Sequence, residues 1–292
     1  MIARLVAACI GACVSTAALA QLTTINLADY RLSGTFGLPA AAAEASAITY
    51  NWDNRNLFVL GDEGDAVVEV TRAGTVVSTM TLTGFADTEG LTYVGNGSFV
   101  LTEERLQDAY LFRYAAGGIA DRGAMPTVDL GPTVGNIGIE GISYDPIGRT
   151  YVTVKETTPQ VVSLSTLDFI SGATMSASLF DPNALGLGDL SDVAVLTTLP
   201  TLTPDQKQNL LIFSQESARL LHVTRSGTVL GQFNLTGVTD AEGVTIDTDG
   251  IIYIAGETPL VYVLTPVPEP ATFLLLAAGL GLLGLRLRSR RA

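Results

Sequence analysis

The residues with the most evident chemistry are acidic residues that recur at fixed places in an internal repeat. Glu89, Glu140 and Glu242 each stand directly before a glycine and an apolar residue. A second acidic series closes the next predicted strand of each unit: Glu63, Glu104, Glu156, Glu216 and Glu257. Carboxylate oxygens are the ligands that Ca²⁺ prefers, and Mg²⁺ accepts them together with more water. Zinc is not expected, because the sequence has one histidine and both cysteines fall in its N-terminal segment.

The repeat itself has five units with a common core. The cores are Ser46-Ala47-Ile48-Thr49-Tyr50, Glu89-Gly90-Leu91-Thr92-Tyr93, Glu140-Gly141-Ile142-Ser143-Tyr144, Ser191-Asp192-Val193-Ala194-Val195 and Glu242-Gly243-Val244-Thr245-Ile246. Their first residues are 43, 51, 51 and 51 positions apart. A period of about 40 to 50 residues in a chain without long helical periodicity is typical of propeller blades.

Each unit continues with a turn, a near-continuous apolar strand and a third strand that alternates more. An apolar run of this kind suits a strand that is buried on both faces. The last unit lacks a fourth strand, whereas residues 25–36 have strand character and no unit of their own. We therefore predict an all-β protein, a propeller of five four-stranded blades closed by an N-terminal strand, plus a C-terminal hydrophobic helix. Six blades, one of them degenerate, is the alternative.

The predicted fold places the two acidic series together. The innermost strand of a blade and the next strand are antiparallel, so the start of one lies beside the end of the other. Both series should therefore converge on the mouth of the central channel, where like charges raise each other's pKa and a cation would relieve the repulsion. The predicted metal ligands are Glu89, Glu140, Glu242, Glu104 and Glu156, with Ca²⁺ as the cofactor. The alternative is structural, with these carboxylates accepting backbone N–H groups between blades.

Other catalytic constellations are sparse in the sequence. The single histidine, His222, lies in a predicted third strand and is interpreted as a blade residue. The sequence contains no Gly-x-Ser-x-Gly elbow and no phosphate-binding loop. These observations disfavour a serine hydrolase and a nucleotide-binding enzyme.

The N-terminus predicts export. Arg4 is the only charge in the first 20 residues, an apolar run follows, and Ala18-Leu19-Ala20 offers a small-x-small cleavage site. This pattern is typical of a secretory signal peptide over residues 1–20. A lipoprotein signal ending at Cys13 is the alternative.

The C-terminus consists of Val267-Pro268-Glu269-Pro270, an apolar run and a basic end. The arrangement resembles the PEP-CTERM signal of Gram-negative bacteria. That resemblance implies export, anchoring in the inner membrane and processing by an exosortase. Residues 271–287 are predicted to form a transmembrane helix whose flanking arginines stay on the cytoplasmic side. This orientation places the body of the protein in the periplasm. Release of the body to the outer surface after processing is left open. An ordinary anchor without processing is the alternative.

The segment between these ends is strongly acidic. Residues 21–285 hold all 29 acidic residues and 11 of the 16 basic residues, which gives them a net charge of −18. Such a body repels nucleic acid and attracts cations. We therefore expect no nucleic-acid partner.

A family resemblance covers the predicted propeller domain, residues 21–266. The stretches from Gly84 to Tyr93, Thr102 to Arg105, Glu140 to Pro146 and Asp240 to Asp247 resemble the SdiA-regulated family of periplasmic β-propellers. The resemblance implies the propeller fold, a location in the cell envelope and, in some members, the ability to hold calcium. It implies little about chemistry.

Two functions fit these observations. The first is an exported binding or interaction module, calcium-dependent and linked to exopolysaccharide, biofilm material or envelope proteins. The alternative is a calcium-dependent hydrolase of a lactone, ester or phosphoester that uses the acidic channel mouth. The scarcity of nearby cations, Arg105 and Lys155 only, counts against an anionic phosphoester substrate. We favour the binding module.

Overall fold

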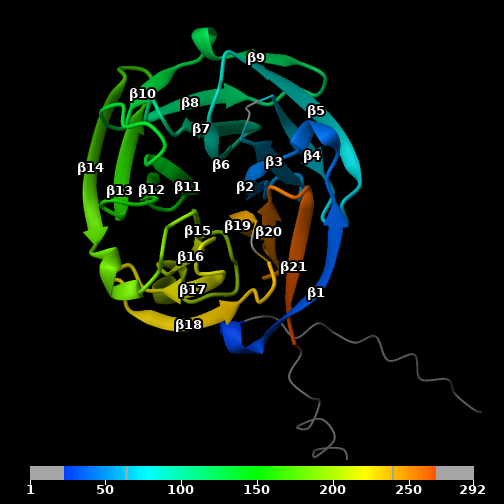
Figure 1. Ribbon diagram of the computed structural model, residues 1–292, viewed down its shortest axis with the longest axis vertical. Coiled ribbons are helices and arrows are strands. Elements are labelled where there is room, and N and C mark those ends of the chain that lie inside the picture. The colour runs from blue at the N-terminus through cyan, green and yellow to red at the C-terminus, as the bar shows by residue number, and fades with distance from the viewer. Residues whose placement is uncertain (1–22, 63–64, 239, 268–292) are drawn as a thin grey trace, which may run out of the picture. The chain divides into compact units, whose positions relative to one another are not determined.

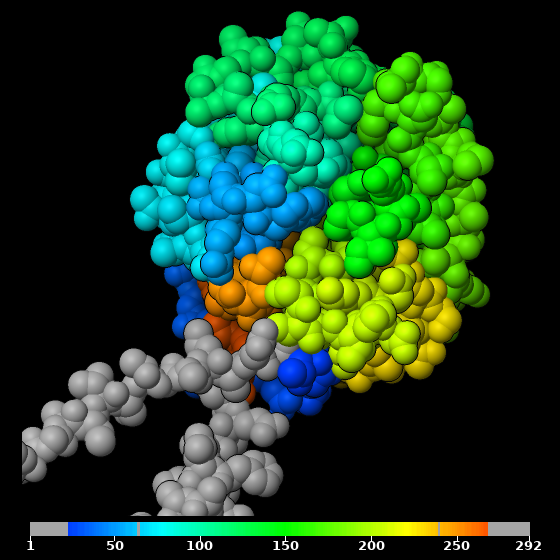
Figure 2. Space-filling view, turned by 180° about the vertical axis from the view of Figure 1, so that it is seen from behind, coloured from blue at the N-terminus to red at the C-terminus, as the bar shows by residue number. Residues whose placement is uncertain are grey.

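The computed structural model describes residues 23–62, 65–238 and 240–267, which form a five-bladed β-propeller (Figure 1). The five blades surround a common centre, and each has its first strand nearest that centre. Seen from behind, the blades pack against one another as five consecutive sectors of the chain (Figure 2). The prediction of five blades is confirmed, and the six-bladed alternative is wrong.

Each blade is a sheet of antiparallel strands, to which blade I adds one parallel strand. Blade I contains β2 (Ala45–Tyr50), β3 (Leu57–Gly61), β4 (Ala66–Val70), β5 (Val76–Thr83) and β9 (Ile119–Asp121); blade II contains β6 (Thr88–Gly95), β7 (Ser98–Glu103), β8 (Asp108–Arg113) and β10 (Thr127–Asp129). Blade III contains β11 (Ile139–Asp145), β12 (Thr150–Lys155), β13 (Val161–Asp168) and β14 (Ala173–Phe180); blade IV contains β15 (Asp192–Val195), β16 (Leu210–Ser214), β17 (Arg219–Val223) and β18 (Val229–Asn234). Blade V contains β19 (Ala241–Ile246), β20 (Ile252–Gly256), β21 (Leu260–Pro266) and β1 (Tyr30–Gly37).

The N-terminal strand closes the ring. β1 pairs antiparallel with β21, from Tyr30 opposite Pro266 to Gly37 opposite Leu260. The backbone N–H of Val267 continues the ladder by donating to the carbonyl of Asp29 at 2.6 Å. The predicted closure is therefore confirmed, and it leaves blade V with four strands although its last two come from opposite ends of the chain (Figure 1).

Blade I departs from the predicted four strands. After β8 the chain returns to blade I, where β9 pairs in parallel with β5, before it supplies β10 to blade II. The long connection between β15 and β16 of blade IV contains the helix α1 (Pro204–Lys207), which has Thr203 as N-cap in a capping box with Gln206. The remaining helices are single 3-10 turns at Leu27–Asp29, Ala40–Ala42, Arg122–Ala124 and Pro182–Leu185.

The hydrophobic core is divided among the spaces between adjacent blades. Each blade buries both faces of its inner strands, so the apolar runs recognised in the sequence fill these spaces. The cluster between blades IV and V contains 17 buried residues and that between blades I and II contains 13. The cluster between blades II and III contains only four: Val100, Ala109, Ile142 and Tyr151. This interface is therefore the least apolar of the five.

Hydroxyl groups join the innermost strands of neighbouring blades. Thr49 accepts a hydrogen bond from the backbone N–H of Tyr93, and Thr92 accepts one from the N–H of Tyr144. The interfaces between blades III and IV and between blades V and I have the same bond, accepted by Ser143 and Thr245 respectively. Between blades IV and V the equivalent residue is an alanine, and a buried carboxylate takes over the connection, since Asp192 accepts from the N–H groups of Val193 and Val244 at 2.7 Å each.

Replacing Thr92 with valine should therefore destabilise the protein by about 1–2 kcal/mol, because the buried N–H of Tyr144 loses its acceptor while side-chain volume is kept. Urea unfolding would measure the change. Thr174→Val, on the exposed strand β14, is the matched control and should change stability by less than about 0.5 kcal/mol. Equal losses in the two variants would contradict a special role for the hydroxyl of Thr92.

Several predictions made from the sequence lie outside the described residues. These are the signal peptide over residues 1–20, the transmembrane helix over 271–287, and Glu63, Pro268, Glu269 and Pro270. Val267 is described and follows β21 directly. Within the described ranges no helix is long and apolar enough to cross a membrane.

Candidate metal centre at the channel mouth

A β-bulge aims the first acidic series into the channel mouth. In the innermost strands of four blades, the pairing register skips one residue, which is left without a partner on the next strand. The skipped residues are Ser46, Glu89, Glu140 and Glu242. A bulge leaves its extra residue outside the ladder and turns its side chain away from the pleat. The repeated Glu-Gly pair of the sequence is therefore the signature of this bulge.

The second series is fixed by a repeated backbone hydrogen bond. The N–H groups of Glu104, Glu156 and Glu257 donate to carbonyls that lie two residues before the bulge of the same blade, at 2.8–3.2 Å. In blade I the same bond, at 2.8 Å, is made by the N–H of Asp62. Asp62, and not Glu63 as predicted, is therefore the equivalent residue.

Blade IV shows the same shift of one residue. The N–H of Gln215 donates to Asp189 and Ser191, and its side chain lines the channel mouth, whereas Glu216 is exposed. The sequence alignment placed Glu216 in the second series because it is acidic. The pairing of the strands shows instead that Gln215 occupies the equivalent position.

The two series enclose a cavity of about 260 Å³ at the start of the innermost strands, which we call the acidic funnel. Ser191, Gln215, Asn136 and Arg105 contribute the other polar side chains. Nine carboxyl groups line it: Asp62, Asp87, Glu89, Glu104, Glu140, Glu156, Asp189, Glu242 and Glu257. All five glutamates predicted as metal ligands are among them. Glu216 of the second series is not, and Glu63 lies outside the described residues. Metal binding by the five glutamates stays a prediction.

The funnel holds its carboxyl groups in close pairs. Burial, followed by the nearby charges of Asp62 and Glu242, raises the pKa of Glu89 to about 10. A hydrogen bond also links the carboxyl group of Glu89 to that of Asp62. One proton shared between two carboxyl groups removes the repulsion that two carboxylates would suffer. In the absence of a cation, Glu89 is therefore protonated at neutral pH.

A second pair joins blades II and III. Burial raises the pKa of Glu140 far above its usual range, and the charges of Glu89 and Glu104 act in the same direction. Glu140 shares a hydrogen bond with Glu104, whose pKa is also raised by burial. Glu104 Oε1 in turn accepts the N–H of Gly138 at 2.7 Å, which fixes its orientation. Glu156 lies beside this pair, and burial raises its pKa as well.

A third pair lies within blade V. Burial and the neighbouring Glu257 raise the pKa of Glu242, and a hydrogen bond connects the two carboxyl groups. Gln215 Nε2 donates to Glu242 Oε1 at 3.1 Å from blade IV.

Two sets of three carboxylates are close enough to hold a cation. Asp62, Asp87 and Glu89 form one set, and Glu104, Glu140 and Glu156 form the other. Within each set one oxygen per residue can be chosen so that all lie within 4.8 Å of one another, which is compatible with oxygens that each stand 2.3–2.6 Å from a calcium ion. Arg105 Nε lies 3.0 Å from Asp87 Oδ2, in an ion pair whose angle does not satisfy a hydrogen bond. The oxygen-only ligands and the excess of negative charge fit a hard divalent cation.

Sequence reasoning missed three contributors to the funnel: Asp62, Asp87 and Asp189. Asp189 is buried and accepts hydrogen bonds from the hydroxyls of Ser191 and Ser214 and from the N–H of Gln215. A signal for Asp87 and Asp189 was present, because the position two residues before each repeat core is Glu44, Asp87, Gly138, Asp189 and Asp240. Four of these five are acidic.

Two residues considered in the sequence lie elsewhere. His222 is buried on β17, where its Nε2 lies 3.1 Å from Asn209 Nδ2, so the interpretation as a blade residue is confirmed. Lys155 ends β12 and faces the space between blades II and III rather than the funnel. Arg105 is thus the only cationic side chain among those described that line the funnel.

Comparisons with known families and structures give two consecutive matches. The model described as SdiA-regulated matches residues 23–265, and that of the PEP-CTERM protein-sorting motif matches residues 266–291. Among solved structures, a glutaminyl cyclase of Myxococcus xanthus is 10% identical with a TM-score of 0.53, over 81% of this chain and 95% of that chain. A streptogramin B lyase is 9% identical with a TM-score of 0.46, over 83% and 99%. A virginiamycin B lyase of Staphylococcus aureus is 13% identical with a TM-score of 0.42, over 78% and 68%. At 10% identity the match to the glutaminyl cyclase indicates a shared fold only.

Proposed function

The chain belongs to the SdiA-regulated family, and from this premise we propose that it is an exported β-propeller that binds its target through a calcium-loaded acidic funnel. Its C-terminal match to the PEP-CTERM motif points to export and to membrane-associated sorting by an exosortase. We further propose that the propeller body resides in the periplasm, that residues 271–287 anchor it to the inner membrane, and that it is processed there. Exopolysaccharide or envelope proteins are the targets we propose.

One observation supports calcium above all others, namely the accumulation of nine carboxyl groups around one cavity with a single arginine. Without a cation Glu89 and Glu140 keep their protons at neutral pH, because burial and the neighbouring carboxyl groups raise their pKa values. A divalent cation would replace those protons and supply the missing positive charge. Glu104, Glu140 and Glu156 would hold one ion, and Asp62, Asp87 and Glu89 a second.

Calcium binding is testable by titration of the purified full-length protein. Saturable heat in calorimetry is expected, and calcium at about 100 times its Kd should stabilise the fold by about 2.7 kcal/mol. For a domain of this size that corresponds to a rise in Tm of roughly 5–10 °C. The double variant Glu89→Gln, Glu140→Gln should lose both the heat and the rise in Tm, because glutamine keeps the shape and removes the charge.

Glu216→Gln is the matched control, since Glu216 is exposed and does not line the funnel. It should bind calcium as the unaltered protein does. If neither heat nor a shift in Tm appears with calcium or magnesium, the carboxyl pairs are structural connections between blades and the proposed function is wrong.

A hydrolase remains the second candidate because the cavity of about 260 Å³ has room for more than one cation. A calcium ion in the funnel would supply Lewis-acid activation of water, and neighbouring carboxylates would accept the proton. A screen of chromogenic esters, lactones and phytate with added calcium separates the two functions. Turnover that requires calcium and disappears in Glu140→Gln would replace the binding module by the hydrolase.

A further inference from the structure

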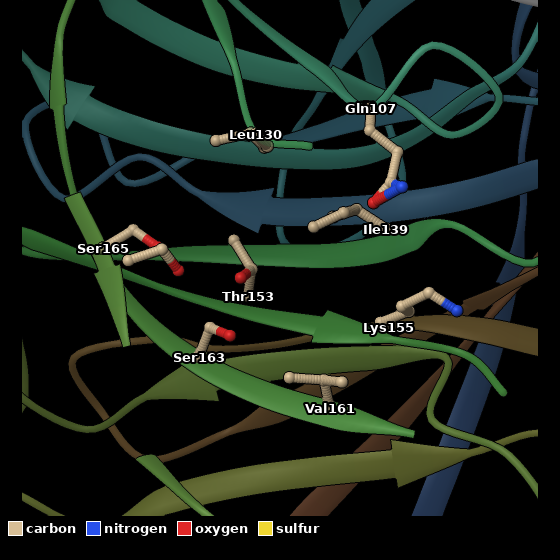
Figure 3. Close-up of a pocket in the computed structure, with 9 residues that line it drawn as sticks. Gln107, Leu130, Ile139, Thr153, Lys155, Val161, Ser163 and Ser165 are labelled. Atoms are coloured by element: carbon tan, nitrogen blue, oxygen red, sulfur yellow. The ribbon is translucent and has the colours of Figure 1, made fainter. Parts of the chain in front are cut away.

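A second cavity lies between blades II and III, the interface with the smallest apolar cluster. It has a volume of about 140 Å³. Figure 3 shows Gln107 and Leu130 from the blade II side facing Thr153, Ser163 and Lys155 on blade III. We call it the interblade pocket. It shares strands with the acidic funnel, because Lys155 lines the pocket and the next residue, Glu156, lines the funnel.

Comparison of the five blades shows that the polar lining is particular to blade III. Thr153 pairs with Ser163 across β12 and β13. The equivalent pairs in the other blades are all apolar or aromatic: Val59 with Val68, Leu101 with Tyr110, Ile212 with Leu221, and Ile254 with Tyr262. Two hydroxyl groups therefore replace two core side chains at this single interface.

The next pair along the same face follows the same rule. Ser165 pairs with Tyr151, whereas its equivalents are Val70, Phe112, Val223 and Leu264. Large-to-small and apolar-to-polar replacements in a core lower stability unless something fills the space and satisfies the polar groups. Ser165 is satisfied within blade III, because it donates to Ser176 Oγ at 2.9 Å. The other two replacements, Thr153 and Ser163, meet at one cavity and point to a site for a ligand rather than a packing fault.

The hydroxyl groups face the cavity with hydrogen-bonding capacity left over. Thr153 is 3% exposed and Ser163 is half-buried, and neither hydroxyl makes a hydrogen bond with another side chain or backbone group of the described residues. Lys155 Nζ donates to the carbonyl of Thr157 at 2.7 Å, which leaves two of its three donors for another acceptor. A buried hydroxyl such as that of Thr153 normally has a hydrogen-bond partner.

The charge of the pocket is opposite to that of the funnel. Among the residues that the structure describes, no carboxyl group lines it, and its one charged group is the ammonium of Lys155, whose charge also acts on the adjacent Glu156. The hydroxyls and the ammonium are hydrogen-bond donors, and a ligand with two acceptor oxygens and negative charge would satisfy them together. Ile139 and Val161 offer an aliphatic wall for a short carbon chain.

We propose that the interblade pocket binds a small carboxylate, held by Lys155 and by the hydroxyls of Thr153 and Ser163. A volume of about 140 Å³ equals roughly five water molecules at about 30 Å³ each, which suits a carboxylate of two to four carbons. The site does not depend on calcium in the funnel, so it goes beyond the proposed function.

The test is ligand-observed NMR on the full-length protein with chelator present. Acetate, lactate and succinate are the carboxylate probes, and glycerol and glucose are neutral probes of similar or larger size. The carboxylates should saturate and compete with one another, and the neutral probes should not bind. Lys155→Met, which keeps the length of the side chain, should weaken carboxylate binding at least 10-fold, and Thr153→Val should weaken it about 3- to 10-fold.

Lys207→Met is the matched control, because Lys207 is the only other lysine of the chain and lies on α1. It should leave carboxylate binding unchanged, and unchanged melting curves of Lys155→Met and Thr153→Val would show that both remain folded. Equal losses in Lys155→Met and Lys207→Met would overturn the proposal in favour of non-specific attraction. Binding of glycerol or glucose as tight as that of lactate, or no binding of any probe at tens of millimolar, would also overturn it. These outcomes are independent of calcium titration, so failure of either proposal is recognisable separately.

Discussion

In the absence of divalent cations, the protein is expected to be more stable at pH 5 than at pH 8. The folded state keeps a proton on Glu89, whose pKa is about 10, while the unfolded chain releases it above about pH 4.3. The stability contributed by this proton is complete below the unfolded pKa and is lost as pH rises toward the folded pKa. Each such group removes up to about 1.4 kcal/mol per pH unit. The raised pKa of Glu140 acts in the same direction.

Urea unfolding in chelator at the two pH values measures the effect, and the double variant Glu89→Gln, Glu140→Gln isolates its source. Glutamine has no proton to release, so the variant should vary less with pH and should exceed the unaltered protein in stability at pH 8. Burial lowers the pKa of His222, which gives a smaller opposite trend below about pH 6.5, but it is common to both proteins and cancels. A metal-free protein that gains stability between pH 5 and pH 8, equally in both forms, would contradict the protonated pairs.

Replacing Gly243 with valine is expected to destabilise the propeller by about 3 kcal/mol or more, enough to remove much of the stability of a typical domain. Gly243 follows the bulge residue of blade V, where a side chain would point at blade I. A Cβ atom there would lie 2.8 Å from Ala47 Cα and 2.8 Å from the backbone nitrogen of Ile48. Backbone atoms of an inner strand cannot move aside as the end of a flexible side chain can.

Gly34→Ala is the control, since Gly34 lies in β1 and a Cβ atom there would meet nothing within 4 Å. It should change the free energy of unfolding by less than about 1 kcal/mol. Thermal melting of both variants checks the difference. A Gly243→Val protein that melts within a few degrees of the unaltered protein would show that the blades can separate without penalty, and the role assigned to the Glu-Gly pair would be wrong.

Much of the fold was predictable because the same sequence pattern recurs in each unit of the repeat. A glycine after each acidic residue, apolar second strands and an incomplete last unit specified five blades and closure by the N-terminal strand. The fifth strand of blade I was not predictable, because β9 is three residues long and its partner β5 is distant in the sequence.

The location of the site was predictable from the sequence, but the exact set of residues that line it was less so. The second acidic series was assigned correctly at Glu104 and Glu156. In blades I and IV the acidic residue one position further along the chain was chosen instead of Asp62 and Gln215. Strand register settles such choices, and one residue of slip reverses the face of a side chain. The interblade pocket escaped notice altogether, since Thr153, Ser163 and Ser165 are ordinary strand residues until the ladder reveals what occupies their positions in the other blades.

The pairing of β1 with β21 also constrains the order of events during export. Apart from β9 of blade I, the strands of blades I to IV come from consecutive segments of the chain. Under the export that we propose, each of these blades can therefore form most of its sheet soon after its own segment has crossed the membrane. β1 crosses first, yet its partner lies more than 220 residues later in the chain, from Leu260 to Pro266. Until then the first strand has an open edge, which Arg31 and the irregular register after Leu32 make a poor template for other chains. Under the proposed export, the ring is completed only when β21, the last strand before the sorting motif, has crossed the membrane.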